Sequence, residues 1–405
     1  MEDPIKDPEN DQDNDALNES GNDSGGDPAE DPKVLPPLTD LEVRRYRKLK
    51  RIASIVTFVL TIGMLVVVTL TPADEWLRNQ ALETTGNAAF GAAIVFIDLY
   101  IVFQILAFLP HLYSNLFLER RGGMSIQPFG SWIEDWVKGL AISLAFGVAA
   151  AAAVYGLIDA FPETWWLIAG AGITVFVVLL TNLAPVLLMP IFYRFEPLPE
   201  GPVRDRLLGL CDRVGVRTVN ASVWKLSEKS KRSNAAVVGW GNTRKLIVSD
   251  TMLDTYEPDE IEAVLAHELG HHTSGDIRNA ILLQTPITFL SLLAIHYAIG
   301  WLDGPLDLTG RGDLAGMPAM ALILVVVSLI ALPLVNGYSR WREAAADRYA
   351  LKTIDNPESF ARAMEKLAAQ NLANRSPHRL MEIIFHSHPA IDRRIEMARR
   401  EVDSA

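Results

Sequence analysis

Six runs of apolar residues constrain the fold of this 405-residue chain more than any other feature. Each is long enough to cross a lipid bilayer, which takes about 20 helical residues. Because the backbone in lipid must satisfy its own hydrogen bonds, each run is expected to form a helix. We therefore expect a mainly α-helical, polytopic membrane protein with about six spans. The predicted spans are residues 52–71, 89–109, 139–158, 165–189, 280–301 and 317–336.

The distribution of basic residues predicts the orientation of these spans. Six Arg and Lys residues crowd positions 44–51, and three more lie within the loop 110–138. The loops 72–88, 159–164 and 302–316 instead carry more acidic than basic residues. Basic loops stay in the cytosol. We therefore expect a multi-pass protein of a bacterial-type cell membrane, with the loop 110–138, the segment 190–279 and both chain ends in the cytosol.

The acidity of the chain comes from its first residues. Residues 1–40 hold 13 Asp and Glu against two Lys, a balance of -11, whereas the formal net charge of the whole chain is -12. The remainder is close to neutral and does not indicate a nucleic-acid partner. Residues 1–43 are predicted to be a disordered acidic tail, since they contain few large apolar residues. A solvated spacer is favoured over a regulatory role, and no signal peptide is recognisable.

Two segments outside the spans are long enough to fold. Residues 191–279 predict a small cytosolic α+β domain between spans 1–4 (44–190) and spans 5–6 (280–336). Residues 337–405 predict a C-terminal segment of helices that are broken at Asn-Pro, Ser-Pro and His-Pro pairs. The elements expected within 191–279 are a helix over 201–214, a strand over 221–226, a hairpin of 234–239 with 244–249 turning at 240–243, and a helix from Pro258 through His271.

A metal-binding motif lies on the last of these predicted helices. The run His267-Glu268-Leu269-Gly270-His271 matches H-E-x-x-H, in which two histidines four residues apart share one helix face. Glu268 would lie beside the ion, where it can accept a proton from the attacking water. The single cysteine, Cys211, excludes a cysteine-based zinc site. One zinc ion held by His and carboxylate groups is therefore expected.

The motif needs a third protein ligand, and Glu343 is the favoured candidate. The metzincin pattern is excluded, because Ser274 and Ile277 stand where it requires Gly and His. Glu343 follows the sixth span closely, and small alanines around it would let the motif helix approach. Asp347, four residues on, could then accept a hydrogen bond from a ligating imidazole. Asp276 and His388 are the rival ligands.

Together these residues resemble the type I CAAX prenyl proteases, membrane zinc endopeptidases of the gluzincin group. The likeness extends from about Tyr113 to Met397. It is carried by Phe117–Gly122, Asp135–Lys138, Pro190–Leu198, Asn234-Ala235, Asp250-Thr251, the HELGHH run at 267–272, the S-R-x-x-E-x-x-A-D run at 339–347, His388-Pro389 and Arg394. Eukaryotic members have seven spans around an intramembrane chamber, whereas six are counted here, and the acidic tail is not part of the family pattern.

The resemblance implies a role for each site residue. It implies zinc ligation by His267, His271 and Glu343, with Glu268 as general base and Asp347 orienting an imidazole. It implies that Asn234 and the strand it opens hold the substrate backbone, and that His388 and Arg394 stabilise the oxyanion and position substrate.

The leading hypothesis is therefore a zinc endopeptidase that cleaves membrane-attached polypeptides, either CAAX-type termini or damaged membrane proteins. One alternative is a site-2-type intramembrane protease, which the charged helix before His267 disfavours. The other is an inactive membrane scaffold or chaperone, which the intact Glu268 disfavours.

Overall fold

The computed structural model describes residues 38–216, 220–239 and 244–404. The predicted hairpin turn at 240–243 and most of the predicted acidic tail lie outside these residues. Helix α1 begins at Asp40, before the predicted end of the tail at 43, because Thr39 and Glu42 form a capping box at its N-terminus. Residues 38–404 belong to one compact unit.

The predicted fold class is confirmed, since most described residues are helical and surround a small sheet. The longer helices are α1 (Asp40–Thr69), α2 (Ala73–Thr85), α3 (Ala88–Leu112), α5 (Phe129–Ala160), α6 (Trp165–Leu183), α8 (Pro202–Arg213), α10 (Pro258–Thr273), α11 (Asp276–Leu302), α12 (Met317–Thr353), α13 (Pro357–Gln370) and α15 (Ile391–Ser404). The shorter ones are η1 (Tyr113–Leu118), α4 (Glu119–Arg121), η2 (Ala184–Leu188), α7 (Met189–Phe192), α9 (Asp250–Thr255), η4 (Leu314–Gly316) and α14 (Arg379–Phe385).

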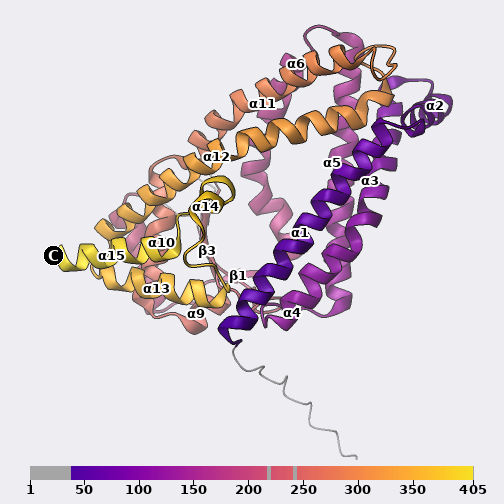
Figure 1. Cartoon of the computed structure of the whole chain (residues 1–405). Coiled ribbons are helices and arrows are strands. Elements are labelled where there is room, and N and C mark those ends of the chain that lie inside the picture. Colours follow the sequence, from indigo (N-terminus) through magenta and orange to yellow (C-terminus); the bar gives the residue numbers. More distant parts are fainter. Residues whose placement is uncertain (1–37, 217–219, 240–243, 405) are drawn as a thin grey trace, which may run out of the picture. The chain divides into compact units, whose positions relative to one another are not determined.

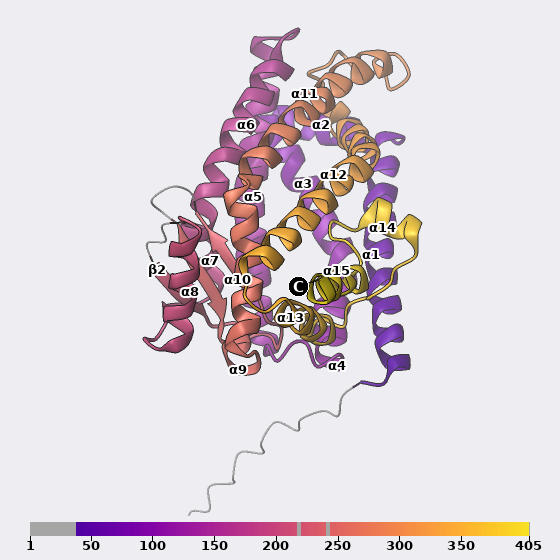
Figure 2. The ribbon, with the colours of Figure 1, turned by 90° about the vertical axis from the view of Figure 1, so that its left-hand side faces the viewer.

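Six helical stretches of the described chain are long and apolar enough to cross a membrane, in agreement with the six predicted spans. Figures 1 and 2 show them running from the end that holds the sheet, α10, α13 and α15 toward the end that holds α2. They are residues 40–69, 88–121, 129–160, 165–192, 276–302 and 314–353.

The helices extend well beyond the apolar runs that predict them. The predicted loop 110–138 is largely helical, because α3 continues through η1 and α4 to Arg121 and α5 begins at Phe129. The predicted boundary at 336/337 falls inside α12, which is continuous to Thr353. The loop 72–88 contains α2, which was not predicted. Hydropathy indicates where a segment leaves the lipid. A helix can continue beyond that point wherever its residues favour helical structure.

The segment 191–279 forms a sheet of four strands in the order β1-β2-β4-β3. The predicted hairpin is β3 (Ala235–Val238) paired antiparallel with β4 (Lys245–Ser249). The predicted strand at 221–226 is β2 (Asn220–Trp224), which pairs parallel with β4. The unpredicted β1 (Phe195–Pro197) pairs antiparallel with β2. As a result β3 lies at one edge of the sheet.

Helix α10 lies at the centre of the hydrophobic core outside the spans and packs closely on α12. Its residues from Glu260 to Gly270 are almost all buried. A Cβ at Gly270 would lie 3.1 Å from Ala346 Cα and 3.2 Å from Ala346 O, tighter than ordinary contacts. The two helix backbones can therefore approach this closely because one contributes Gly270 and the other Ala346. This packing fixes the distance between the side chains that α10 and α12 direct at each other.

Candidate metal centre

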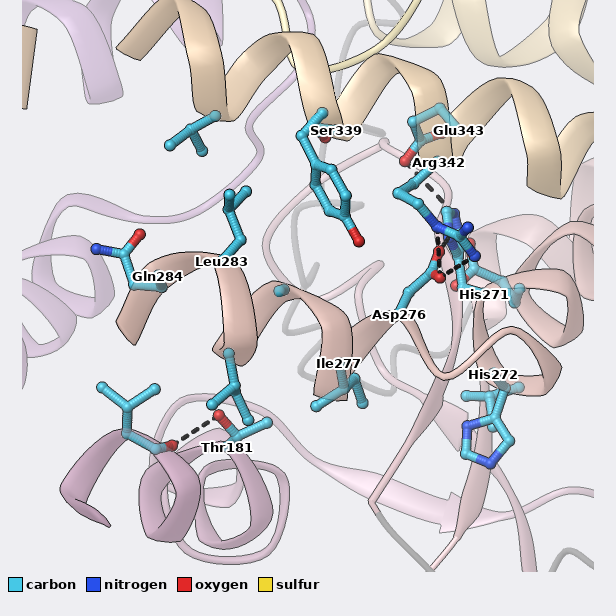
Figure 3. A pocket seen from close by; sticks show the side chains of 17 residues that line it. Thr181, His271, His272, Asp276, Ile277, Leu283, Gln284, Ser339, Arg342 and Glu343 are labelled. Atoms are coloured by element: carbon cyan, nitrogen blue, oxygen red, sulfur yellow. Dashed lines mark hydrogen bonds and ion pairs between the residues drawn. The ribbon is translucent and has the colours of Figure 1, made fainter. Parts of the chain in front are cut away.

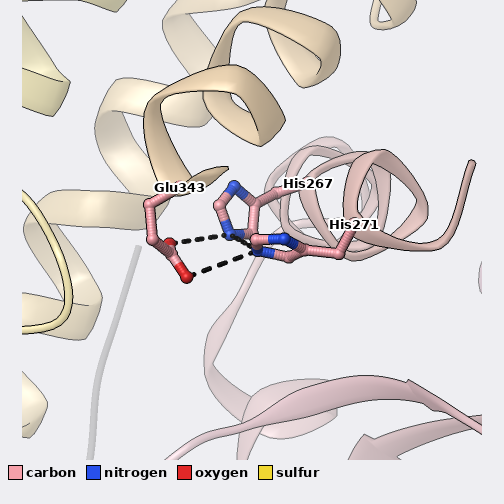
Figure 4. Close-up of side chains that lie close together, drawn as sticks. All are labelled: His267, His271 and Glu343. Carbon is pink, nitrogen blue, oxygen red and sulfur yellow. Dashed lines mark hydrogen bonds and ion pairs between the residues drawn. The ribbon is translucent and has the colours of Figure 1, made fainter. Parts of the chain in front are cut away.

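Three side chains from α10 and α12 converge on one point. His267 and His271 project from one face of α10, and Glu343 projects from α12 toward them (Figure 4). The two Nε2 atoms are 3.1 Å apart, and each lies 3.4 Å from an oxygen of Glu343. His272, on another face of α10, is not part of this group.

The spacing of these atoms fits a tetrahedral zinc site. Zinc binds imidazole nitrogen and carboxylate oxygen at about 2.0–2.2 Å, so two ligand atoms at tetrahedral positions lie about 3.3–3.6 Å apart. The observed separations of 3.1, 3.4 and 3.4 Å agree with that value. Glu343 is buried, with Oε2 facing His267 and Oε1 facing His271. Two imidazoles and one carboxylate suit zinc and leave a fourth position for water or substrate.

A carboxylate and an arginine hold the first imidazole in place. Asp347 Oδ1 lies 2.8 Å from His267 Nδ1, so that Nε2 is directed toward His271 and Glu343. Arg394 contacts both oxygens of Asp347, at 2.8 and 2.6 Å, and is buried with it. Arg394 was expected to position substrate. Its guanidinium lies against Asp347, where the carboxylate neutralises a charge that would otherwise be buried alone. Its role toward substrate stays a prediction.

The second imidazole has a matching pair of partners that sequence reasoning missed. Asp276 Oδ2 lies 2.8 Å from His271 Nδ1, and Arg342 Nε donates to Asp276 Oδ1 at 2.7 Å (Figure 3). Asp276 was weighed only as a rival zinc ligand, and it does not join the three converging groups. Gly275, at a φ of 65°, reverses the chain after α10 and brings Asp276 back to His271. The Gly275-Asp276 pair, which begins four residues after His271, was the available signal.

The carboxylates make this site attractive to positive charge. Burial disfavours the charged form of His267, but the hydrogen bonds that it donates to Asp347 and Glu343 outweigh this effect and raise the pKa of His267 to about 9. The same negative potential favours a divalent cation bound by neutral imidazoles. Burial also raises the pKa of Glu268 above the usual carboxyl range. A carboxylate with a raised pKa is a better proton acceptor, as a general base requires.

His388 and Asn234 lie at the border of the site. His388 is exposed, and its Nδ1 lies 2.9 Å from Glu343 Oε2. The structure therefore places His388 beside the three converging groups, although it comes from the loop before α15. Asn234 is exposed just before β3, and its backbone N–H donates to Ser249 Oγ at 2.9 Å. Asn234 and His388 line the same cavity.

Two cavities meet at the site. The first, of about 660 Å³, is lined by Glu268, His271 and Val237 and by apolar side chains of three spans, including Val177, Leu283 and Val335 (Figure 3). The second, of about 860 Å³, is lined by Asn234, His388 and mostly polar residues. Because Asn234 opens β3 and Val237 lies near its other end, the edge strand runs from the polar cavity to the apolar one.

Asp347 and Asp276, the carboxylates that contact the two imidazoles through Nδ1, lead to a pair of matching predictions. We expect Asp347→Asn and Asp276→Asn each to weaken zinc affinity by about 10–100-fold, since each removes the charge that orients and polarises one imidazole. Competition with a fluorescent zinc chelator measures the affinity. Asp205→Asn, an exposed position on α8, is the matched control and should leave the affinity unchanged. Unchanged affinity in Asp276→Asn would mean that its contact with His271 does not support the metal centre.

Family models match nearly the whole described chain. Residues 197–402 match the model described as Peptidase family M48. Residues 42–194 match the model described as CAAX prenyl protease N-terminal, five membrane helices. In this range the described structure has four of the spanning stretches and the shorter α2. The zinc motif, Glu343 and Arg394 all fall within the first match.

Individual relatives are consistent with these matches. The chain is 29% identical over 286 residues to a protein of Bacillus subtilis named uncharacterized metalloprotease YhfN, covering 69% of this chain. It is 28% identical over 301 residues to CAAX prenyl protease 1 of Saccharomyces cerevisiae, covering 70% of this chain. Each alignment spans 66% of the relative's length, slightly less than two thirds. The crystal structure of S. mikatae Ste24p superposes with a TM-score of 0.76 at 24% identity, covering 89% of this chain and 90% of that one, and shares the fold.

Proposed function

The chain belongs to peptidase family M48, and from this premise we propose that it is a zinc-dependent endopeptidase of the membrane. The observation that carries the proposal is the convergence of His267, His271 and Glu343 at zinc-like spacing, with Glu268 on the same helix turn. A site-2-type mechanism is not supported, because α10 is none of the six candidate spans. The intact Glu268 argues against an inactive scaffold.

Each residue of the site has its own role in the proposed reaction. Bound zinc would polarise the scissile carbonyl and lower the pKa of water to about 7. Glu268 takes the proton from the attacking water and later delivers it to the leaving amine. His388, which is exposed and contacts Glu343, can turn to donate a hydrogen bond to the oxyanion. Asp347 with Arg394, and Asp276 with Arg342, keep the two imidazoles in place.

The edge strand gives the substrate a binding path. We propose that an extended polypeptide pairs with the free edge of β3, with Asn234 contacting its backbone. Such a segment would run from the polar cavity past the metal centre into the apolar cavity between the spans. The apolar walls favour substrates that are themselves attached to the membrane. Processing of CAAX-type termini, as in the named yeast relative, and removal of damaged membrane proteins are the two proposed roles.

Removal of the metal tests the proposed activity. In vesicles containing the purified protein and a membrane-attached polypeptide, a zinc chelator is expected to abolish cleavage, and added zinc to restore it, because the ligands alone cannot polarise the carbonyl. The readout is the appearance of peptide fragments by mass spectrometry. Cleavage that continues unchanged after the chelator has removed all zinc would contradict a metal-dependent mechanism.

The proposed topology puts the active site and both chain ends in the cytosol. A reporter fused after Ala405 should then be active in the cytosol. A cysteine in place of the exposed Gly304, in the loop between α11 and α12, should react with an impermeant thiol reagent from outside intact cells. The matched control is Gly209→Cys on α8, also in open space, which should react only after the cells are permeabilised. The reverse pattern would invert the orientation of all six spans.

A further inference from the structure

Helix α14 packs on α12 at the level where the predicted first and sixth spans end. Figures 1 and 2 both show it between α1 and α12. Asn336, the last residue of the predicted sixth span, donates to Ile384 O at 2.6 Å. Arg340, one turn further along α12, donates to Glu382 O at 2.9 Å and His386 O at 2.6 Å. On the other side, Arg51, directly before the predicted first span, is close enough to act on the charge of His386.

Helix α14 carries three large apolar side chains that are exposed. Leu380, Ile383 and Phe385 are 62%, 41% and 56% exposed. Large apolar side chains are expected to be scattered on a water-exposed surface, whereas three of them on a seven-residue helix form a patch. Ile55 of the first span is likewise exposed, at 53%.

Basic side chains surround this patch in the arrangement of an interfacial helix. Arg379 begins α14 and is exposed, and Arg340 caps its C-terminal carbonyls. Arg47 of α1 donates to Ala373 O at 2.9 Å in the segment that leads to α14. Helices that lie in a membrane surface combine an apolar face with flanking cations, which contact lipid headgroups. The position of α14 along the spans, its exposed apolar side chains and the cations beside them all indicate that lipid covers these side chains.

The inner face of α14 contacts the loop that carries His388. Glu382 is buried, accepts a hydrogen bond from Ala390 N at 3.0 Å and forms an ion pair with Arg393. His388 lies two residues before Ala390 and three after Phe385, with its Nδ1 2.9 Å from Glu343 Oε2. A displacement of α14 would therefore be passed through Glu382 to His388.

We infer that α14 is a membrane-surface anchor, with Leu380, Ile383 and Phe385 inserted in the lipid leaflet and Glu382 holding the His388 loop at the metal centre. Insertion is independent of the proposed function, whereas the consequence for His388 depends on it. The bilayer would then act as part of the support for the active site, and the arrangement predicts a difference between detergent and lipid.

The first arm of the test measures depth without requiring activity. Single cysteines at Leu380, Ile383 and Phe385, in a Cys211→Ala background, carry nitroxide labels in lipid nanodiscs. Their accessibility to oxygen, which concentrates in lipid, is compared with that to a water-soluble nickel complex. The matched control for Leu380 is Leu41, an even more exposed leucine at 77% that lies ten residues before Arg51 on α1. Ile55 serves as the lipid reference.

Labels on α14 are expected to resemble the one at Ile55 and to differ from the one at Leu41. Labels that favour the nickel complex as Leu41 does would overturn the inference. Labels shielded from both reagents would also overturn it, because they would indicate a second copy of the chain or another protein on the patch.

The second arm replaces all three residues by serine. In nanodiscs, cleavage by this variant is expected to fall on the order of tenfold or more, since a small displacement of a catalytic group has effects of this size or larger. Zinc content should be unchanged, and Leu41→Ser should be as active as wild type. Full activity in the triple variant would overturn the link to His388. If the wild-type protein bound no zinc and cleaved nothing, the proposed function would fail while the depth measurements still decided the insertion.

Discussion

Glu268→Gln is expected to keep zinc bound and to lower the rate of peptide cleavage by about a hundredfold or more, the usual contribution of a positioned general base. Glu268 is not among the three converging groups, so its loss removes no ligand. Glutamine has nearly the same size and cannot accept a proton at the required pH. Initial rates on a fixed peptide, together with zinc content by mass spectrometry, measure the two effects separately.

The control for this substitution is Glu200→Gln, an exposed carboxylate that pairs with Arg204 on the surface. It should leave both rate and zinc content unchanged. Wild-type rates in Glu268→Gln would show that another group activates the water. The same variant, if inactive and folded, is a trap for natural substrates, because it can bind polypeptides without releasing fragments.

Glu343→Ala is expected to abolish cleavage. It should also weaken zinc binding more than the loss of Asp347 or Asp276, for which we expect about 10–100-fold. The substitution leaves two imidazoles, and it also removes the group that His388 contacts. Glu343→Asp keeps the charge but shortens the side chain by one methylene, which withdraws the oxygen from the two Nε2 atoms. It should bind zinc weakly. Zinc affinity and activity are measured on the same preparations.

Substitutions of the two rival ligands, Asp276 and His388, should affect zinc binding less than Glu343→Ala. Asp276 contacts His271 through Nδ1, on the side of the ring away from the metal centre, so Asp276→Ala should weaken zinc binding less than Glu343→Ala. His388→Ala should keep zinc and lose mainly rate, because His388 is expected to act on the oxyanion. If Glu343→Ala kept full zinc while Asp276→Ala or His388→Ala lost it, the third ligand would be assigned wrongly.

The spans and the motif could be predicted because each depends on local sequence. An apolar run of sufficient length has few alternatives in a membrane. The spacing of His267 and His271 determines that both rings share a helix face wherever that helix lies. Glu343 was within reach of prediction because it follows a span closely and stands among small residues. The close contact of Gly270 with Ala346 is the packing that those small residues permit.

The contacts beyond the ligands could not be predicted, since they join residues distant in sequence. Arg394 reaches Asp347 only after α13 and α15 have folded back along α12. Asp276 is close to the motif in sequence, but its role depends on the left-handed conformation of Gly275. Helix ends were misplaced for another reason. Charged residues at 119–121 end the apolar run, yet the helix continues there because Leu116, Leu118 and Glu119 are buried.

The zinc content of the purified wild-type protein tests the central claim most directly. After gentle purification and resupply of zinc, mass spectrometry should find about one zinc per chain, as expected for a site with three protein ligands. His267→Ala and His271→Ala should each lose most of it, because both Nε2 atoms belong to the converging group. A wild-type protein that binds no zinc under these conditions, or variants that retain all of it, would contradict the metal centre.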